Sequence, residues 1–281
     1  MADMLWQPSK ERIQNTHMYR FMTGINEKFG KDFSTYDALY QWSIQNIPDF
    51  WAAMWDFAGI RASRSYDQVV DDPLRMPGAR WFAGAELNFA ENLLRYRDDH
   101  VALIFRGEER DPVRMTYGEL YDEVARVARA LRDLGIRPGD RVAGFMPNIP
   151  ETIVATLAAT SLGATWSSCS PDFGIKGVLD RFGQIKPRVL FTANGYAFKG
   201  KTFDSLGRVS DILKELPTIE TVVVVPFTEE SPDLSTVPNA VAYEDFKSPE
   251  SGLDIDFEQL PAEHPLYIMF TSGTTGLPKC M

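Results

Sequence analysis

The stretch LYIMFTSGTTGLPK, Leu266 to Lys279, places a segment rich in glycine, serine and threonine directly after a short apolar run. The run Leu266–Phe270 predicts a buried strand, and ligands of open α/β sheets bind beyond the carboxyl ends of such strands. Glycines let main-chain N–H groups approach an anion, hydroxyls add hydrogen-bond donors, and a lysine adds mobile positive charge. We therefore predict a phosphate-binding loop, whose candidate contacts are Thr271, Ser272, Gly273, Thr274, Thr275, Gly276 and Lys279.

The spacing of this loop differs from that of a Walker A loop, G-x-x-x-x-G-K-[ST]. Gly273 and Gly276 are too close together, Lys279 follows a proline, and Cys280 stands where the magnesium-binding hydroxyl would be. The sequence also contains no GxGxxG, HExxH or GxSxG pattern. These observations argue against a P-loop kinase or GTPase, a dinucleotide-binding fold, a zinc protease and an α/β-hydrolase.

Upstream of the loop, from Val101 onward, short apolar runs alternate with helical patterns. The helix over 115–136 has the clearest signals, because Thr116 and Glu119 have capping-box spacing and Gly135 supplies a stop. Alternation of strands and helices predicts parallel βαβ units, hence an α/β fold with a parallel sheet and helices on both faces. The predicted strands are 101–105, 140–146, 164–168, 188–193 and 221–226, and the predicted helices are 115–136, 151–162, 178–185 and 210–216. An acidic segment, 227–239, predicts an exposed insertion.

The first third of the chain is rich in aromatic residues and contains two predicted helices over 34–60. Ser34 is a candidate N-cap, Pro48 suits a first helical turn, and Gly59 suits a stop. The aromatic side chains at helical spacing predict packing on a domain more readily than a ligand box. The segment 71–94 predicts an extended chain that turns helical near Asn88. We expect a helical and extended amino-terminal cap over 1–95 and an α/β domain over 96–281.

The bulk composition narrows the function classes. The chain has 281 residues and a net charge of -10, which argues against general nucleic-acid or anionic-membrane binding because the long-range field repels both. Cys169 and Cys280 are far apart and lack metal-ligand neighbours, so we predict no disulfide framework and no metal site. No apolar run is long enough for a signal peptide or a membrane span, so a cytoplasmic enzyme is expected.

The segment TSGTTGLPK resembles the phosphate loop of the acyl-adenylate-forming superfamily, which includes acyl-CoA synthetases, adenylation domains and luciferases. Other stretches are similar to its acetoacetyl-CoA synthetase branch, namely YDALYQWSIQNIPDFWAAMWDFAGI, RWFAGAELNFAENLLR, SSCSPDFGIKGVLDRFGQIKP and HPLYIMFTSGTTGLPKCM. The resemblance covers nearly the whole chain. It implies the large-domain fold of these enzymes, which are more than twice as long, so we expect an amino-terminal part that ends just after the phosphate loop.

The resemblance implies a two-step reaction. ATP and acetoacetate, with magnesium, give an acyl-adenylate and pyrophosphate, and the thiol of CoA then displaces AMP to form acetoacetyl-CoA. The phosphate loop would hold the β- and γ-phosphates, and its glycines fit a mobile lid. The adenine, ribose, acyl and magnesium contacts and the catalytic lysine are expected beyond Met281, so the chain alone is expected to be inactive. The alternatives are a ligase for acetate, propionate or another short acid, or a non-catalytic nucleotide-binding fragment.

The resemblance also implies a CoA site, with candidate contacts Ser170, Pro171, Asp172, Lys199 and Lys201. Relatives in the acetyl branch carry arginines where this chain has Phe198 and Lys201, with Lys199 between them. The two lysines could meet a CoA phosphate, and a solvated Lys-Gly-Lys turn is the alternative. The implied partners are therefore small molecules, with no nucleic acid and no membrane.

Overall fold

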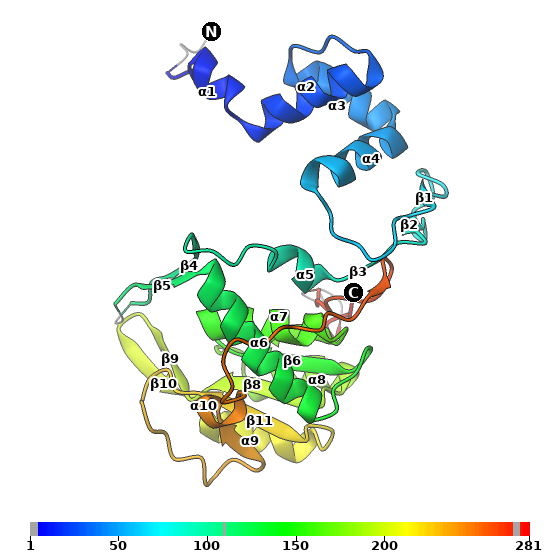
Figure 1. Cartoon of the computed structure of the whole chain (residues 1–281). Coiled ribbons are helices and arrows are strands. Elements are labelled where there is room, and N and C mark those ends of the chain that lie inside the picture. Colours follow the sequence, from blue (N-terminus) through cyan, green and yellow to red (C-terminus); the bar gives the residue numbers. More distant parts are fainter. Residues whose placement is uncertain (1–4, 109–110, 272–275) are drawn as a thin grey trace. The chain divides into compact units, whose positions relative to one another are not determined.

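The computed structural model describes residues 5–108, 111–271 and 276–281 (Figure 1). The chain divides into two compact units, Met1–Ala85 and Glu86–Met281, called here the amino-terminal unit and the α/β unit. The sequence suggested a boundary at 95/96. The structure divides the chain earlier because α5 (Phe89–Leu93) packs on the α/β unit, where Ala90 and Leu94 join its hydrophobic core.

The amino-terminal unit is mainly helical. Thr16 and Thr35 cap the helices that follow them, because each side chain accepts a hydrogen bond from a backbone N–H in the first turn. The prediction of Ser34 as a cap is therefore wrong by one residue, whereas Gly59 ends its helix in the left-handed conformation as expected. The elements are α1 (Lys10–Gln14), α2 (His17–Phe29), α3 (Tyr36–Gln45) and α4 (Ile47–Ala58), then β1 (Gln68–Val70) and β2 (Trp81–Ala83), which pair antiparallel.

The aromatic side chains of this unit form its core. Trp42 is buried and packs against Phe29 and Phe33, and the ring of Phe21 meets that of Phe50 edge to face. The expectation of packing is therefore confirmed for Trp42 and Phe50, whereas Trp51 and Phe57 are exposed.

The α/β unit is built on a five-stranded parallel sheet with the order β12-β11-β8-β6-β7. This confirms the predicted fold class. The strands are β6 (Arg141–Phe145), β7 (Thr165–Cys169), β8 (Val189–Ala193), β11 (Thr221–Val225) and β12 (Ala240–Ala242), of which only β12 was not predicted.

Helices cover both faces of this sheet. On one face lie α5, α6 (Tyr117–Asp133), α7 (Pro150–Ser161) and α10 (Tyr243–Phe246), and on the other lie α8 (Ile175–Ile185) and α9 (Leu206–Glu215). Side chains of a strand alternate between the faces, so Val223 and Val225 join the first core while Val222 and Val224 join the second. This explains why β11 is apolar at every position but its first.

Two antiparallel pairs outside the five-stranded sheet differ from the sequence-based expectation. The strand β4 (Val101–Phe105) pairs antiparallel with β5 (Val113–Thr116) in a separate two-stranded sheet, and Val101 and Ile104 are exposed. The predicted buried strand is thus covered on one face only, a difference that a short apolar run does not encode. The hairpin of β9 (Gly195–Phe198) and β10 (Lys201–Asp204) was not predicted, because its strands are short and of mixed polarity.

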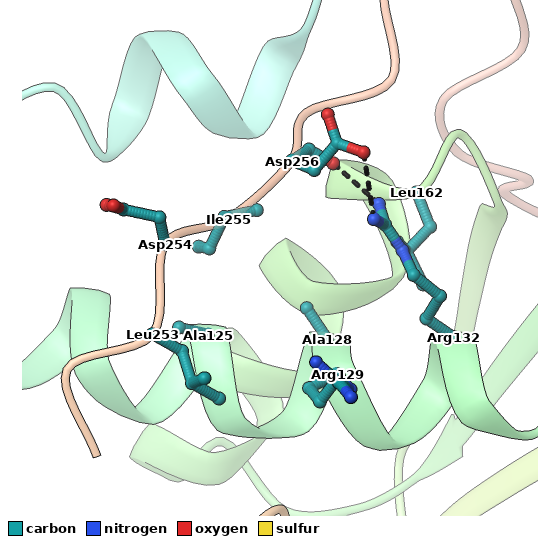
Figure 2. Close-up of a pocket in the computed structure, with 9 residues that line it drawn as sticks. All are labelled: Ala125, Ala128, Arg129, Arg132, Leu162, Leu253, Asp254, Ile255 and Asp256. Carbon is teal, nitrogen blue, oxygen red and sulfur yellow. Dashed lines mark hydrogen bonds and ion pairs between the residues drawn. The ribbon is translucent and has the colours of Figure 1, made fainter. Parts of the chain in front are cut away.

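A long segment, residues 248–264 and called here the strap, crosses α6 from the β12 edge of the sheet toward its β7 edge (Figure 1). The phenol of Tyr121 accepts a hydrogen bond from Ile255 N, and the Arg132 guanidinium binds both the carboxylate and the carbonyl of Asp256. Figure 2 shows the Arg132–Asp256 contacts beside a pocket between the strap and α6. The pocket has a volume of about 80 Å³, far too small for a nucleotide.

Beyond Asp256 the strap forms β13 (Leu260–Pro261), which pairs antiparallel with β3 (Glu86–Leu87). The segment 266–271, which follows the strap, therefore lies at the β7 edge of the sheet. No helix among the described residues is both apolar enough and long enough to cross a bilayer.

Candidate functional site

The segment 266–270 runs parallel to β7 at the edge of the sheet. Trp166 N donates to Leu266 O at 3.0 Å, and Ile268 N donates to Trp166 O at 2.8 Å. The hydroxyl of Ser167 adds a bond to Ile268 O at 2.9 Å. The loop that follows therefore begins at the carboxyl edge of a parallel sheet, as predicted.

The prediction that this segment is buried is wrong for one of its faces. Ile268 and Phe270 pack against the core beneath α8 and α9, but Tyr267 is 38% exposed and Met269 is 61% exposed. Successive side chains of an extended chain point to opposite faces. Ile268 and Phe270 therefore face the core, whereas Tyr267 and Met269 point the other way.

The two ends of the candidate phosphate loop are joined as a hairpin stem. Met269 and Met281 exchange two backbone hydrogen bonds of 3.0 and 2.8 Å, and Thr271 N donates to Lys279 O at 3.1 Å. Lys279 N in turn donates to the Thr271 hydroxyl at 3.4 Å. The structure thus brings Thr271 and Lys279 face to face. Gly276 is exposed, and the predicted contacts Ser272, Gly273, Thr274 and Thr275 lie outside the described residues.

Gln184, near the end of α8, binds the returning arm of this stem. Its amide Nε2 donates to Pro278 O at 2.9 Å, and its Oε1 accepts from the Cys280 thiol at 3.4 Å. Sequence reasoning missed this residue, because the partners lie 94 and 96 positions further along the chain. Gln184 therefore fixes the arm that carries Lys279 to the body of the α/β unit.

Replacing Gln184 by alanine is expected to loosen the arm 278–281. The loss of two hydrogen bonds, worth about 1 kcal/mol or less each at an exposed site, should speed backbone amide exchange there by roughly tenfold. Hydrogen–deuterium exchange followed by mass spectrometry measures this. Gln41→Ala, at an exposed glutamine of α3, is the control and should leave the arm unchanged. Equal exchange in Gln184→Ala and the parent chain would contradict the assignment.

The candidate CoA contacts lie on two segments. Ser170, Pro171 and Asp172 directly follow β7, whereas Lys199 and Lys201 belong to the β9–β10 hairpin, which follows β8. Both segments therefore leave the carboxyl ends of strands that flank β6. The structure gives the hairpin turn an unusual backbone, since Lys199 and Gly200 both have positive φ, 52° and 67°.

The hairpin turn binds a carboxylate. Lys199 N and Gly200 N donate to the two carboxylate oxygens of Glu108 at 3.2 and 3.0 Å. Consecutive N–H groups in left-handed conformation form a concave anion-binding nest. The hydrogen bonds from Gly200 and Lys199 lower the pKa of Glu108. The turn can thus hold an anion, and in this chain the anion is Glu108.

The Glu108 contact should be pH-dependent in one direction. Because the folded-state pKa is lowered, the contact is fully formed above the ordinary glutamate pKa of about 4.3 and is lost as the pH falls through the lower folded-state value. The NMR amide shift of Gly200, in glycine-labelled protein, should therefore change with a midpoint below about 4.3. Gly252, in the strap, serves as the control resonance. A midpoint at or above the ordinary value, or no change in Glu108→Gln relative to the parent at neutral pH, would contradict this contact.

The thiol of Cys169, the last residue of β7, is unsuited to nucleophilic chemistry. Burial raises the pKa of the Cys169 thiol to about 12, although Arg181 opposes the shift, so this cysteine is a poor nucleophile. Within the described ranges, no group of three or more His, Cys, Asp or Glu side chains could hold a metal ion.

Two described protein families match this chain. A family described as AMP-binding enzyme matches residues 89–281, and one described as acetyl-coenzyme A synthetase N-terminus matches residues 36–93. Acetoacetyl-CoA synthetase from Danio rerio is 45% identical over 100% of this chain and 43% of its own length. Acetoacetyl-coenzyme A synthetase from Rhizobium meliloti (strain 1021) is 46% identical over 99% of this chain and 42% of its own length.

A solved structure extends the similarity to the fold. Acetoacetyl-CoA synthetase from Streptomyces lividans superposes with a TM-score of 0.91 at 41% identity, over 100% of this chain and 43% of the solved chain. This chain therefore spans less than half the length of the relatives that it matches.

Proposed function

The chain belongs to the AMP-binding enzyme family, and we propose that it is the amino-terminal part of an AMP-forming acetoacetate–CoA ligase. The longer protein that contains it is called here the full-length protein. It would convert acetoacetate and ATP to an acyl-adenylate and pyrophosphate, then transfer the acyl group to CoA with release of AMP. The observation that carries this proposal is the phosphate loop, closed by the Thr271–Lys279 pairing at the carboxyl edge of a parallel sheet.

The contribution of this chain to the first step is electrostatic. Displacement at the α-phosphorus needs little covalent chemistry from the protein, so positioning and charge stabilisation dominate. Within the described residues, the Lys279 ammonium has no carboxylate partner, so its charge is available to departing pyrophosphate. Thr271 lies opposite and adds a hydroxyl, and the loop between them would wrap the phosphates.

The second step needs a site for CoA, which we propose at Ser170, Pro171, Asp172, Lys199 and Lys201. Two ammonium groups on a hairpin next to the carboxyl ends of β7 and β8 suit the phosphates of CoA. ATP, CoA and acetoacetate are thus the proposed substrates. Magnesium is implied by the family, its protein contacts are expected beyond Met281, and no step here runs through it. Both cysteines are free, which is compatible with the reducing cytoplasm that we propose as its location.

The choice of acid is tested with the full-length protein. ATP, CoA and a panel of acetoacetate, acetate and propionate are supplied in turn, and thioester formation is measured. We expect kcat/KM to be highest for acetoacetate. Higher kcat/KM for acetate or propionate would favour the alternative, a short-chain acyl-CoA synthetase, and no thioester with any acid would favour a non-catalytic nucleotide-binding protein.

A further inference from the structure

Arg208 lies where the carboxyl ends of three neighbouring strands come together. Its guanidinium carbon is 5.7 Å from the ring centre of Phe145, the last residue of β6. It is 5.4 Å from the ring centre of Tyr196 on the hairpin that follows β8. It also reaches the segment that follows β7, where Nη1 donates to Pro171 O at 2.9 Å and to Phe173 O at 3.4 Å.

This place is the switch point of the sheet. The chain leaves β6 through α7 toward β7, on one side, and leaves β8 through α9 toward β11, on the other. In open α/β sheets, ligands bind outside the carboxyl ends of two adjacent strands whose connections leave in opposite directions. Arg208, in the first turn of α9, therefore lies at the place in the sheet where this rule expects a ligand.

The hydrogen bonds of Arg208 go to backbone carbonyls. Besides Pro171 and Phe173, Nη2 donates to Asp204 O at 3.2 Å, at the end of the hairpin. Among the described residues no carboxylate pairs with its guanidinium, and carbonyl dipoles leave the full positive charge in place. The two terminal nitrogens of the guanidinium thus join the segment that follows β7 to the end of the β9–β10 hairpin. The uncompensated positive charge favours an anion nearby.

We propose that Arg208 is a positioning residue of the CoA site, which holds Ser170–Asp172 in fixed relation to the hairpin that carries Lys199 and Lys201. This proposal rests on the proposed function. Arg208 acts through the segments that it joins: it orients the Pro171 carbonyl from one side and supports the Tyr196 ring, itself stacked on Phe203 at 5.0 Å, from the other. Both segments belong to the proposed CoA site and neither to the proposed phosphate loop, so Arg208 should serve only the thiol-transfer step.

The test separates the two steps in the full-length protein. Arg208→Gln removes the positive charge and the planar set of guanidinium donors, and Arg208→Lys keeps only the positive charge. We expect the KM for CoA to rise roughly 10- to 100-fold in Arg208→Gln and less in Arg208→Lys, by the usual weight of hydrogen bonds to a charged group. Acid-dependent ATP–pyrophosphate exchange needs no CoA, so on this proposal it should stay within about twofold of the parent. Arg129→Gln, at an exposed arginine of α6 paired with Asp133, is the matched control.

The outcomes are distinct. An unchanged KM for CoA in Arg208→Gln would overturn the proposal, and so would an equal loss of exchange and thiol transfer, which would indicate a general structural role. If the parent protein shows no exchange with any acid, the proposed function fails. The dissociation constant for CoA, measured by calorimetry, then still decides whether Arg208→Gln weakens CoA binding more than Arg129→Gln does.

Discussion

Replacing Lys279 by alanine in the full-length protein is expected to lower acetoacetate-dependent ATP–pyrophosphate exchange by roughly 10²-fold or more, the usual effect of removing one preorganised group that stabilises developing charge. The stem of the loop holds Lys279 opposite Thr271 through two contacts of 3.1 and 3.4 Å, and Gln184 fixes the same arm to α8. The backbone of Lys279 is thus positioned before ATP binds. Its removal should cost transition-state stabilisation more than ATP affinity.

Two variants sharpen this prediction. Lys279→Arg keeps the charge and should restore part of the exchange activity. Lys176→Ala removes an exposed lysine of α8 that pairs with Asp180 within the helix, and it should leave exchange unchanged. Exchange that survives in Lys279→Ala at the parent rate would show that the loop does not act on pyrophosphate through this residue.

Replacing Asn88 by alanine should lower the free energy of unfolding by about 3 to 5 kcal/mol, from loss of a helix cap and of a shared buried donor. Asn88 is 1% exposed. Its amide donates to the carbonyls of Thr160, Ser161 and Glu258 at 3.2, 3.1 and 2.8 Å, while its Oδ1 caps α5 through Glu91 N. One side chain therefore ties α5, the end of α7 and the strap together.

Urea denaturation of the full-length protein measures this effect. Asn88→Asp keeps the capping oxygen but places a carboxylate against the three carbonyls, so it should also lower the free energy of unfolding. This variant separates the contribution of the amide donor from that of the helix cap. Asn148→Ala, at an exposed asparagine just before α7, should change stability by less than about 0.5 kcal/mol. A change below about 1 kcal/mol in Asn88→Ala, the usual effect of losing a helix cap alone, would show that the carbonyl contacts contribute little.

The sequence predicts those parts of the fold that have local signals. The capping box of Thr116 and Glu119 is formed as expected, with Glu119 bound to Thr116 N at 2.8 Å. The apolar strand β11 lies within the sheet because both of its faces are covered. The candidate phosphate loop also has a local signal, since its glycines, hydroxyls and lysine are contiguous in the chain, but its phosphate contacts stay a prediction.

The remainder depends on contacts between distant residues. The partner of Gln184 at Pro278 lies 94 positions away, and that of Arg208 at Pro171 lies 37 away. In both pairs the acceptor is a backbone carbonyl, which every residue type provides, so no pattern marks the pair. The strap lacks periodicity for a related reason, because single side chains such as Arg132 and Tyr121 hold it in place.

The central claim is that the full-length protein activates acetoacetate as an adenylate on the loop that Thr271 and Lys279 close. The most direct measurement omits CoA: the full-length protein is mixed with ATP, magnesium and acetoacetate, quenched, and analysed by mass spectrometry. We predict acetoacetyl-AMP and pyrophosphate in equal amounts, at a level lowered in Lys279→Ala. Formation of ADP and phosphate in their place, or no acyl-AMP at all, would contradict the account.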